Sequence, residues 1–354
     1  MDWDFIIVGA GSAGGVLAKR LAEAGFRTLI LEAGGRDNYH WVHIPMGYLY
    51  CIGNPRTDWM YKTAEEPGLN GRAILYPRGK VLGGCSSING MLYLRGQAAD
   101  YDGWRQLGLM GWGWDDVLPY FKKSEDYVDG PSEMHGAGGE WRVENQRLHW
   151  DLLDDWIRAA EEAGIPRTGD FNTGNNEGVG YFRVNQRNGW RMNTAKAFLR
   201  TYAGPNLRVE THAHTTRLIM EGCRVTGVEF RRNGQLHRVM ARREVVLSAG
   251  AVNSPQILQL SGIGPADHLA EHGIDAVADL PSVGAHLADH PDVSMQWGSD
   301  RMDLSHAKYQ RLDHAARLMA QWLLNGGGPG GGAFFSTVLF LAFDDSALPE
   351  LEVF

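Results

Sequence analysis

Residues 4–35 read DFIIVGAGSAGGVLAKRLAEAGFRTLILEAGG. The apolar run 5–8 is typical of a parallel strand that is buried on both faces. A glycine-rich turn over 9–14 follows it, and then come a helix over 12–24 and a second apolar strand over 28–31. A strand, a glycine turn, a helix and a strand in this order are typical of a unit that binds a dinucleotide. The stretch therefore predicts an α/β fold with a Rossmann-like cofactor-binding domain.

The glycine turn has the pattern G-x-G-x-x-G. Gly9 allows the tight turn, Gly11 lets a diphosphate lie against bare backbone, and Gly14 lets the helix pack closely on the strand. The helix N-terminus supplies unpaired N–H groups for the phosphates. Glu32 ends the second strand, where its carboxylate can accept hydrogen bonds from both ribose hydroxyls. The carboxylate disfavours NADP, both NAD and FAD fit, and an ordinary βαβ unit with an empty turn is the alternative.

Composition disfavours several classes of protein. The chain has 354 residues, 46 glycines and a formal net charge of −8, which is typical of a loop-rich α/β enzyme and disfavours a nucleic-acid partner. No signal peptide is visible, and no apolar run is long enough to span a bilayer. Cys51, Cys85 and Cys223 have neither disulfide nor metal spacing. This cysteine usage predicts a cytoplasmic protein.

A second informative stretch, residues 76–96, reads YPRGKVLGGCSSINGMLYLRG. Its glycines make a backbone surface that a flat ligand can approach closely. Ser86, Ser87 and Asn89 supply hydrogen-bonding groups that fix the ligand's orientation. Cys85 is interpreted as a small packing residue rather than as a nucleophile, because no base is evident nearby. The stretch predicts a second loop that contacts the cofactor.

Two motifs in the chain resemble one enzyme family. Residues 78–91, RGKVLGGCSSINGM, resemble the first signature of the glucose–methanol–choline (GMC) oxidoreductases, which are FAD-dependent alcohol oxidases and dehydrogenases. Residues 250–264, GAVNSPQILQLSGIG, are similar to the second signature. The resemblance implies that the cofactor is FAD. It also implies a Rossmann-like FAD-binding domain with an incomplete α+β substrate domain.

The glycine turn and the resemblance together imply a set of cofactor-binding residues. These residues are Gly9, Gly11, Ser12, Ala13, Gly14, Glu32, Ala33, Val81, Gly84, Ser86, Asn89, Gly90, Met91, Thr215 and Ala249. The family usually has valine where Thr215 stands, on a strand that passes the adenine. Choline-oxidase-like members have a histidine bonded to the flavin where this chain has Ile88. Isoleucine cannot form that bond, so the resemblance implies non-covalent FAD.

The resemblance implies oxidation of the CH–OH group of an alcohol, with hydride transfer to flavin N5. A quinone-like compound or oxygen would accept the electrons. Proton removal is assigned to a histidine in the last part of the family's chain, so no residue up to Phe354 is expected to be catalytic. We therefore expect a C-terminally truncated member that is inactive by itself. A hydroxynitrile lyase on the same scaffold and a non-catalytic flavin-binding module are the alternatives.

The resemblance also implies the domain organisation. Residues 1–290 would form the FAD-binding region, with part of the substrate domain inserted at about 150–190. Residues 291–354 would begin the substrate-binding domain. Residues 34–73 are rich in aromatic side chains and lack a sustained period, so they form either a lid with a function or an aromatic surface loop.

Further elements are expected around the motifs. The inner face of the first helix is expected to carry Val16, Leu17, Leu21 and Ala24. Short strands are expected over 207–210, 215–220, 224–230, 235–241 and 244–250. A helix is expected over 253–260, beginning at Ser254-Pro255. His212 and His214 would share one face of a strand, but no third ligand has matching spacing, so we expect no metal site.

Overall fold

The structure is a computed structural model that describes residues 3–295, 297–300, 311–332, 335–343 and 348–354. Its residues fall into two compact units, each described here by itself. The first unit comprises residues 1–39, 50–88 and 193–296, and the second comprises residues 40–49, 89–192 and 297–354. The family domains expected over 1–290 and 291–354 stay a prediction.

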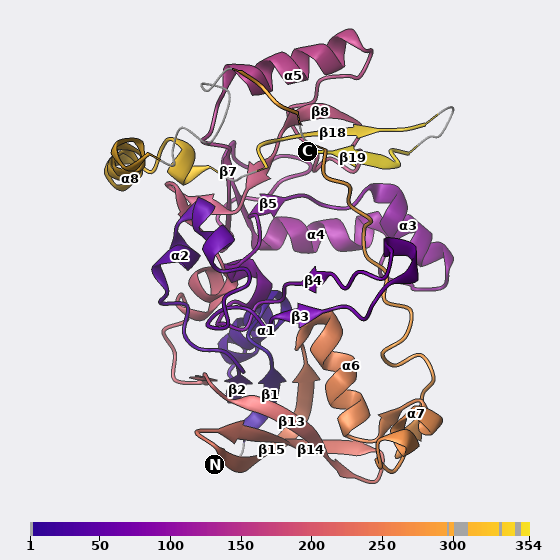
Figure 1. The fold of residues 1–354 in the computed structure, drawn as a ribbon. Helices are drawn as coiled ribbons and strands as arrows, with labels where there is room; N and C mark the ends of the chain where they lie inside the picture. Colours follow the sequence, from indigo (N-terminus) through magenta and orange to yellow (C-terminus); the bar gives the residue numbers. More distant parts are fainter. Residues whose placement is uncertain (1–2, 296, 301–310, 333–334, 344–347) are drawn as a thin grey trace. The chain divides into compact units, whose positions relative to one another are not determined.

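The first unit is built on a six-stranded sheet with the order β12-β2-β1-β15-β14-β13 (Figure 1). Its strands are β1 (Trp3–Val8), β2 (Thr28–Leu31), β12 (Leu207–Glu210), β13 (His214–Glu221), β14 (Arg224–Arg232) and β15 (Gln235–Leu247). Strands β12, β2, β1 and the end of β15 are parallel, whereas β15, β14 and β13 are antiparallel. The parallel half and its helix confirm the predicted Rossmann-like α/β fold.

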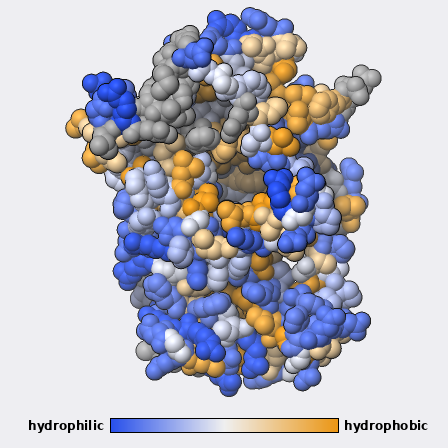
Figure 2. Space-filling view, in the orientation of Figure 1, coloured by the Kyte–Doolittle hydropathy of each residue, from blue (hydrophilic) through white to orange (hydrophobic). Residues whose placement is uncertain are grey.

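Strand β15 belongs to both halves of this sheet. It pairs with β14 from Gln235 to Met240 and with β1 from Ala241 to Leu247. The prediction of two separate strands, over 235–241 and 244–250, is therefore wrong. The chain changes its pairing partner without breaking, because the charged side chains 242–244 stay exposed on the extended strand. The part of Figure 2 over β13 to β15 is accordingly largely hydrophilic.

Helix α1 (Ser12–Glu23) forms where it is predicted, but it buries a different face. Its buried side includes Gly14, Gly15, Ala18 and Ala22. The expected inner face is wrong at Leu17 and Ala24, which are exposed. The other two residues expected there, Val16 and Leu21, are half-buried. A Cβ on Gly14 would lie only 2.0 Å from the carbonyl oxygen of Gly9. The helix lies so close to β1 that only small residues fit between them.

Helix α6 (Gly250–Leu260) begins three residues before the predicted start. Pro255 therefore lies inside the helix, and the expected start at Ser254-Pro255 is wrong. A proline at this position cannot donate the backbone hydrogen bond to the carbonyl group of Ala251. Packing stabilises the helix despite the missing hydrogen bond, because Ile257 is buried in the core formed with β1, β2, β13 and β14.

Shorter elements complete the first unit. Its strands are β3 (Tyr61–Lys62), β4 (Leu75–Tyr76), β16 (Ile263–Gly264) and β17 (Ala278–Asp279). Its other helical elements are α7 (Ala266–Glu271), η2 (Pro67–Leu69), η3 (Gly84–Ser87) and η4 (Ala195–Leu199). Strand β3 lies within the aromatic stretch 34–73 and forms an antiparallel pair with β4, which follows that stretch.

The second unit contains short sheets and five α-helices among its described residues. The sheet order β5-β9-β7-β6 uses Leu92–Tyr93, Arg183–Val184, Trp141–Asn145 and Glu125–Tyr127. The sheet order β19-β18-β8 uses Leu351–Val353, Thr337–Leu341 and Gly178–Tyr181, and the pair β10-β11 uses Gln186–Arg187 and Trp190–Arg191. The helices are α2 (His40–His43), α3 (Ala98–Gln106), α4 (Trp114–Ser124), α5 (Asp151–Glu162) and α8 (Leu312–Asn325). Two short helical turns are η1 (Pro45–Tyr50) and η7 (Pro329–Gly331).

Helix α5 shows how the second unit forms its core. Ile157 and Ala160 are buried against Val179 of β8 and Leu339 of β18. Burial of each large aliphatic side chain stabilises the unit by roughly 1.5–3 kcal/mol. Among the described residues, no helix has the length and apolar character that crossing a bilayer requires.

A buried charged network lies in the second unit. The ring of His135 contacts Glu125 through Nδ1 at 3.1 Å and Asp170 through Nε2 at 2.6 Å. Arg95 donates to the Glu125 carboxylate at 2.9 Å. Burial alone would lower the pKa of His135, but its hydrogen bonds to Asp170 and Glu125 outweigh burial and raise that pKa to about 8. The imidazolium form therefore joins the two carboxylates.

We predict that this network makes stability depend on pH. The folded pKa of His135, about 8, lies above the ordinary value of 6.5, so the stabilisation is complete below pH 6.5 and is lost as the pH rises through 8. The free energy of unfolding should fall by about 2 kcal/mol over this interval. Urea unfolding at a series of pH values measures it.

The variant His135→Gln should be less stable at pH 6 and should lack this part of the pH dependence. His149→Gln is the matched control, because His149 is an exposed histidine of the same unit. An unchanged wild-type unfolding free energy between pH 6.5 and 8.5 would contradict the prediction.

Candidate functional site

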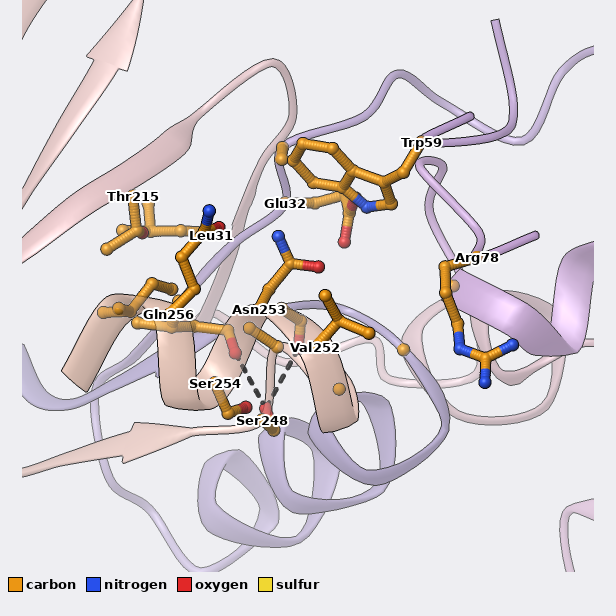
Figure 3. Close-up of a pocket in the computed structure, with 18 of the residues that line it drawn as sticks. Leu31, Glu32, Trp59, Arg78, Thr215, Ser248, Val252, Asn253, Ser254 and Gln256 are labelled. Atoms are coloured by element: carbon orange, nitrogen blue, oxygen red, sulfur yellow. Dashed lines mark hydrogen bonds between the residues drawn. The ribbon is translucent and has the colours of Figure 1, made fainter. Parts of the chain in front are cut away.

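The first unit encloses a cavity of about 560 Å³ (Figure 3). Its walls come from the turn after β1, the end of β2, strand β13, the turn between β15 and α6, and two loops around residues 59 and 79–85. The volume lies within the usual range for ligand sites. The carboxyl ends of β1, β2 and β15 meet here, which is where open α/β sheets bind their ligands.

The glycine turn forms one wall of the cavity. Gly9 has a φ of +94°, a conformation that residues with side chains rarely adopt. Gly11 lines the cavity, and a Cβ there would meet nothing closer than the Cα of Gly84 at 3.8 Å. Ser12 and Ala13, the first residues of α1, line it as well. Bare backbone and the N-terminus of a 12-residue helix thus face open space, which suits a diphosphate.

Glu32 places a buried carboxyl group at the cavity wall. Its two oxygens accept hydrogen bonds from the N–H groups of Ala10, at 3.0 Å, and Gly34, at 2.8 Å. Burial raises the pKa of Glu32 to about 7, although these N–H groups and Lys80 lower it. Each oxygen keeps a second lone pair that can accept a ribose hydroxyl.

The opposite wall contains polar groups from β13 and α6. Asn253 donates to the hydroxyl of Tyr61 at 2.8 Å, which holds α6 against β3. Thr215 lines the cavity, and its buried hydroxyl oxygen has no hydrogen-bond partner. Buried polar groups in proteins are almost always paired, so an unpaired hydroxyl beside a cavity suits a polar ligand. Trp59 also lines the cavity, and its indole ring stacks with Tyr61 at 5.7 Å between the ring centres.

The structure brings most of the predicted residues of the first unit to this cavity. The predicted residues that line it are Gly9, Gly11, Ser12, Ala13, Glu32, Ala33, Gly84, Thr215 and Ala249. Gly14 does not line the cavity but allows the close packing of α1 on β1. Val81 is buried and forms an isolated bridge with Gly35, and Ser86 bonds to Thr194 at 2.7 Å. The roles of these residues toward a cofactor stay predictions.

The remaining predicted residues belong to the second unit. Asn89, Gly90 and Met91 directly follow the part of the signature loop that belongs to the first unit. Asn89 accepts a hydrogen bond from Arg191 at 2.9 Å, and its side chain also accepts one from the N–H of Met91 at 3.1 Å. Met91 has a φ of +63°. Their contact with a cofactor stays a prediction.

Sequence reasoning missed several residues that line the cavity. Asn253 and Gln256 lie inside the second signature, so the motif itself contained a signal for them. Trp59 comes from the stretch 34–73, whose role the sequence left open between a lid and a surface loop, and Arg78 is the first residue of the first signature. They share the cavity because Asp58 and Gly79 pair in an antiparallel bridge, which no local pattern predicts.

The histidine pair of β13 is not formed as expected. His212 precedes the strand, has a φ of +56°, and donates its N–H to the carbonyl oxygen of Gly34 at 2.8 Å. Only His214 belongs to β13, and it lines the cavity. In the part of the chain that the structure describes, no group of three or more His, Cys, Asp or Glu residues could hold a metal ion. Cys85 lines the cavity and accepts a hydrogen bond from the N–H of Gly79 at 3.3 Å.

The Rossmann-like unit, with the glycine turn and the buried carboxyl group at its cavity, is typical of proteins that bind a dinucleotide. Residues 3–292 match the family described as GMC oxidoreductase, so the chain belongs to that family. FAD is therefore its cofactor, and the cavity residues fit the ADP half of this molecule. The resemblance inferred from residues 78–91 and 250–264 is confirmed.

Relatives of known sequence agree with this membership. An oxygen-dependent choline dehydrogenase of Stenotrophomonas maltophilia is 42% identical over 351 residues, which cover 97% of this chain and 62% of that protein. The mitochondrial choline dehydrogenase of Homo sapiens is 39% identical over 349 residues, covering 96% of this chain and 59% of that protein. The chain thus spans about three fifths of the length of these relatives.

Solved structures share the fold. Formate oxidase superposes with a TM-score of 0.86 at 28% identity, covering 96% of this chain and 61% of that one. Pyridoxine 4-oxidase from Mesorbium loti has a TM-score of 0.76 at 35% identity, covering 79% of this chain and 56% of that one.

We predict that FAD binding tightens as Glu32 loses its proton. The pKa of Glu32 is about 7, so the carboxylate fraction rises about tenfold between pH 6 and pH 8, and the carboxylate is the stronger acceptor for ribose hydroxyls. The affinity of the apoprotein for FAD should rise by up to about the same factor. Quenching of flavin fluorescence measures it.

Glu32→Gln should bind FAD more weakly than the wild type at pH 8 and should lack the pH dependence. Glu23→Gln is the control, because Glu23 is an exposed carboxylate at the end of α1 and does not line the cavity. Equal pH dependence in wild type and Glu32→Gln would assign the titration to another group.

We also predict that FAD is bound without a covalent link. Ile88 is buried and has no nucleophilic atom. It therefore cannot form the bond to the flavin that is expected of the histidine at this position in choline-oxidase-like family members. Acid precipitation of the yellow protein should leave the flavin in the supernatant, with a solution of free FAD carried through as the control. Yellow colour that stays in the washed pellet would show that the prediction is wrong.

Proposed function

We propose that the protein takes part in FAD-dependent oxidation of the CH–OH group of an alcohol, as an oxidoreductase of the choline-dehydrogenase type. The observation that carries this proposal is the nucleotide cavity of the first unit, formed by the glycine turn, Glu32 and the turn that starts α6. Membership in the GMC family and the choline dehydrogenase relatives support the alcohol as substrate. A quinone-like compound or oxygen would accept the electrons.

The chain's own residues would hold and orient the cofactor. The first N–H groups of α1 would bind the diphosphate, and the bare backbone of Gly11 would let it approach. Glu32 would accept the ribose hydroxyls, while Thr215 would offer its unpaired hydroxyl to the adenosine half. Bound FAD supplies the acceptor for the hydride that leaves the alcohol carbon.

Choline is the first substrate to test, because the relatives named above are choline dehydrogenases. Other primary alcohols form the comparison set. A cytoplasmic location stays part of the proposal, and the human relative is named as mitochondrial.

We predict that the 354-residue chain binds FAD but does not reduce it with choline or other primary alcohols. The proposal assigns proton removal to a histidine in a region that follows residue 354 in the family, and general base catalysis contributes typically 10²–10⁴-fold to such a reaction. Anaerobic mixing with each alcohol, followed through the flavin absorption band, is the measurement. Chemical reduction with dithionite controls for a reducible flavin.

A longer polypeptide that continues past Phe354 in the same reading frame provides the positive test. It should bleach the flavin band with at least one primary alcohol. Bleaching by the 354-residue chain itself would overturn the assignment of the base. If the longer polypeptide released cyanide from mandelonitrile without reducing its flavin, the proposed oxidoreductase activity would be wrong and a hydroxynitrile lyase activity would replace it.

A further inference from the structure

Arg78 is the one arginine among the described residues that line the nucleotide cavity, and no lysine is among them. A diphosphate brings two negative charges into a cavity that already contains the Glu32 carboxyl group. The N-terminus of α1 offers only about half of one positive charge. A positively charged side chain would therefore balance the remaining negative charge of the diphosphate. Arg78 was not among the cofactor-binding residues expected from the sequence.

The backbone of Arg78 is held in place beside the cavity. Its N–H donates to the buried carboxylate of Asp58 at 3.1 Å, and its carbonyl oxygen accepts from the N–H of Trp59 at 2.9 Å. The next residue, Gly79, packs against Gly84, since a Cβ on Gly79 would lie 2.3 Å from the carbonyl carbon of Gly84. The anchor therefore leaves only the side chain of Arg78 free to reorient.

The same packing connects Arg78 to the phosphate-binding turn. A Cβ on Gly84 would lie 2.7 Å from the Cα of Gly11, so the loop after Arg78 touches the glycine turn backbone to backbone. Figure 3 shows Arg78 on the side of the cavity that is opposite Thr215. The cavity thus extends from Thr215 past the glycine turn to Arg78.

The guanidinium group of Arg78 makes few contacts for its capacity. Of its five N–H groups, one donates to the carbonyl oxygen of Pro77 at 2.7 Å and one to the hydroxyl of Tyr76. Its Nη2 lies 3.8 Å from the Asp289 carboxylate, which is a long ion pair, and the group stacks 4.0 Å from the ring centre of Tyr76. Tyr76 donates its own hydroxyl to Asp289 at 2.7 Å. Asp289 is therefore retained by Tyr76 even when Arg78 leaves it.

We propose that Arg78 binds the diphosphate of FAD and that it exchanges the Asp289 carboxylate for the phosphate oxygens when the cofactor enters. A planar guanidinium binds phosphate oxygens through two parallel hydrogen bonds, which are shorter and stronger than its long contact with Asp289. Asp289 therefore competes with the cofactor for Arg78. The proposal rests on the cavity being the ADP half of the FAD site.

The test measures the binding of FAD, ADP and adenosine to the full-length apoprotein by isothermal titration calorimetry. In Arg78→Gln, which keeps part of the side-chain stem, affinity for FAD and ADP should fall by roughly ten- to a hundredfold. Affinity for adenosine, which has no phosphate, should stay unchanged. Arg78→Lys should retain part of the ADP affinity, because it keeps the charge but not the two parallel bonds.

Two further variants separate phosphate binding from a structural role. Asp289→Asn keeps an acceptor for the Tyr76 hydroxyl and removes the competing charge, so ADP should bind up to about fivefold more tightly. Arg72→Gln is the matched control, because Arg72 is exposed between η2 and β4 and does not line the cavity. The wild type should lose ADP affinity with added salt more steeply than Arg78→Gln does.

Several results would overturn the proposal. Unchanged ADP affinity in Arg78→Gln would exclude a phosphate contact, and an equal loss for adenosine would mean that Arg78 only shapes the cavity. Weaker ADP binding in Asp289→Asn would contradict the competition. Failure of the wild type to bind either adenosine or ADP would instead reject the cavity as the ADP half of the FAD site.

Discussion

The close approach of helix α1 to strand β1 is the constraint on which the cofactor site depends. Gly14 faces the carbonyl group of Gly9 so closely that no side chain fits there. Because the helix lies this close, its N-terminus opens directly onto the cavity at the ends of the parallel strands. The dipole of the helix and its unpaired N–H groups can then act on a diphosphate without a side chain in between.

The same kind of contact recurs in the other segments around the cavity. A Cβ on Gly34 would lie 2.0 Å from the carbonyl oxygen of Lys80, and Gly79 and Gly84 touch in turn. Three chain segments, 9–14, 34–35 and 79–84, therefore meet backbone to backbone. This packing explains the glycines at positions 14, 34, 79 and 84, since a side chain at any of them would force the segments apart.

Buried charges are treated differently in the two units. In the second unit, Glu125 accepts from Arg95, His135 and the N–H of Gly136, so burial is outweighed and its pKa is lowered. In the first unit, Glu32 has two backbone N–H partners, and they do not outweigh burial, so its pKa is raised. A fully paired network stabilises its own unit, whereas an incompletely paired carboxyl group is available to a ligand. The contrast supports the prediction that Glu32 binds the cofactor, whereas His135 belongs to the packing of the second unit.

Local patterns of glycines, apolar runs and motifs were enough to predict the Rossmann-like unit, the FAD cofactor and nine of the residues that line the cavity. The face that α1 buries depends instead on its packing, since a helix pressed against a strand favours Ala18 and Ala22 over Leu17. The tertiary structure also decided that β15 runs through residues 242–244, because pairing with β1 and β14 outweighs the local charge. Trp59 and Arg78 reach the cavity through the pairing of Asp58 with Gly79. Such pairings depend on contacts between residues far apart in the chain, so they cannot be predicted from local sequence patterns.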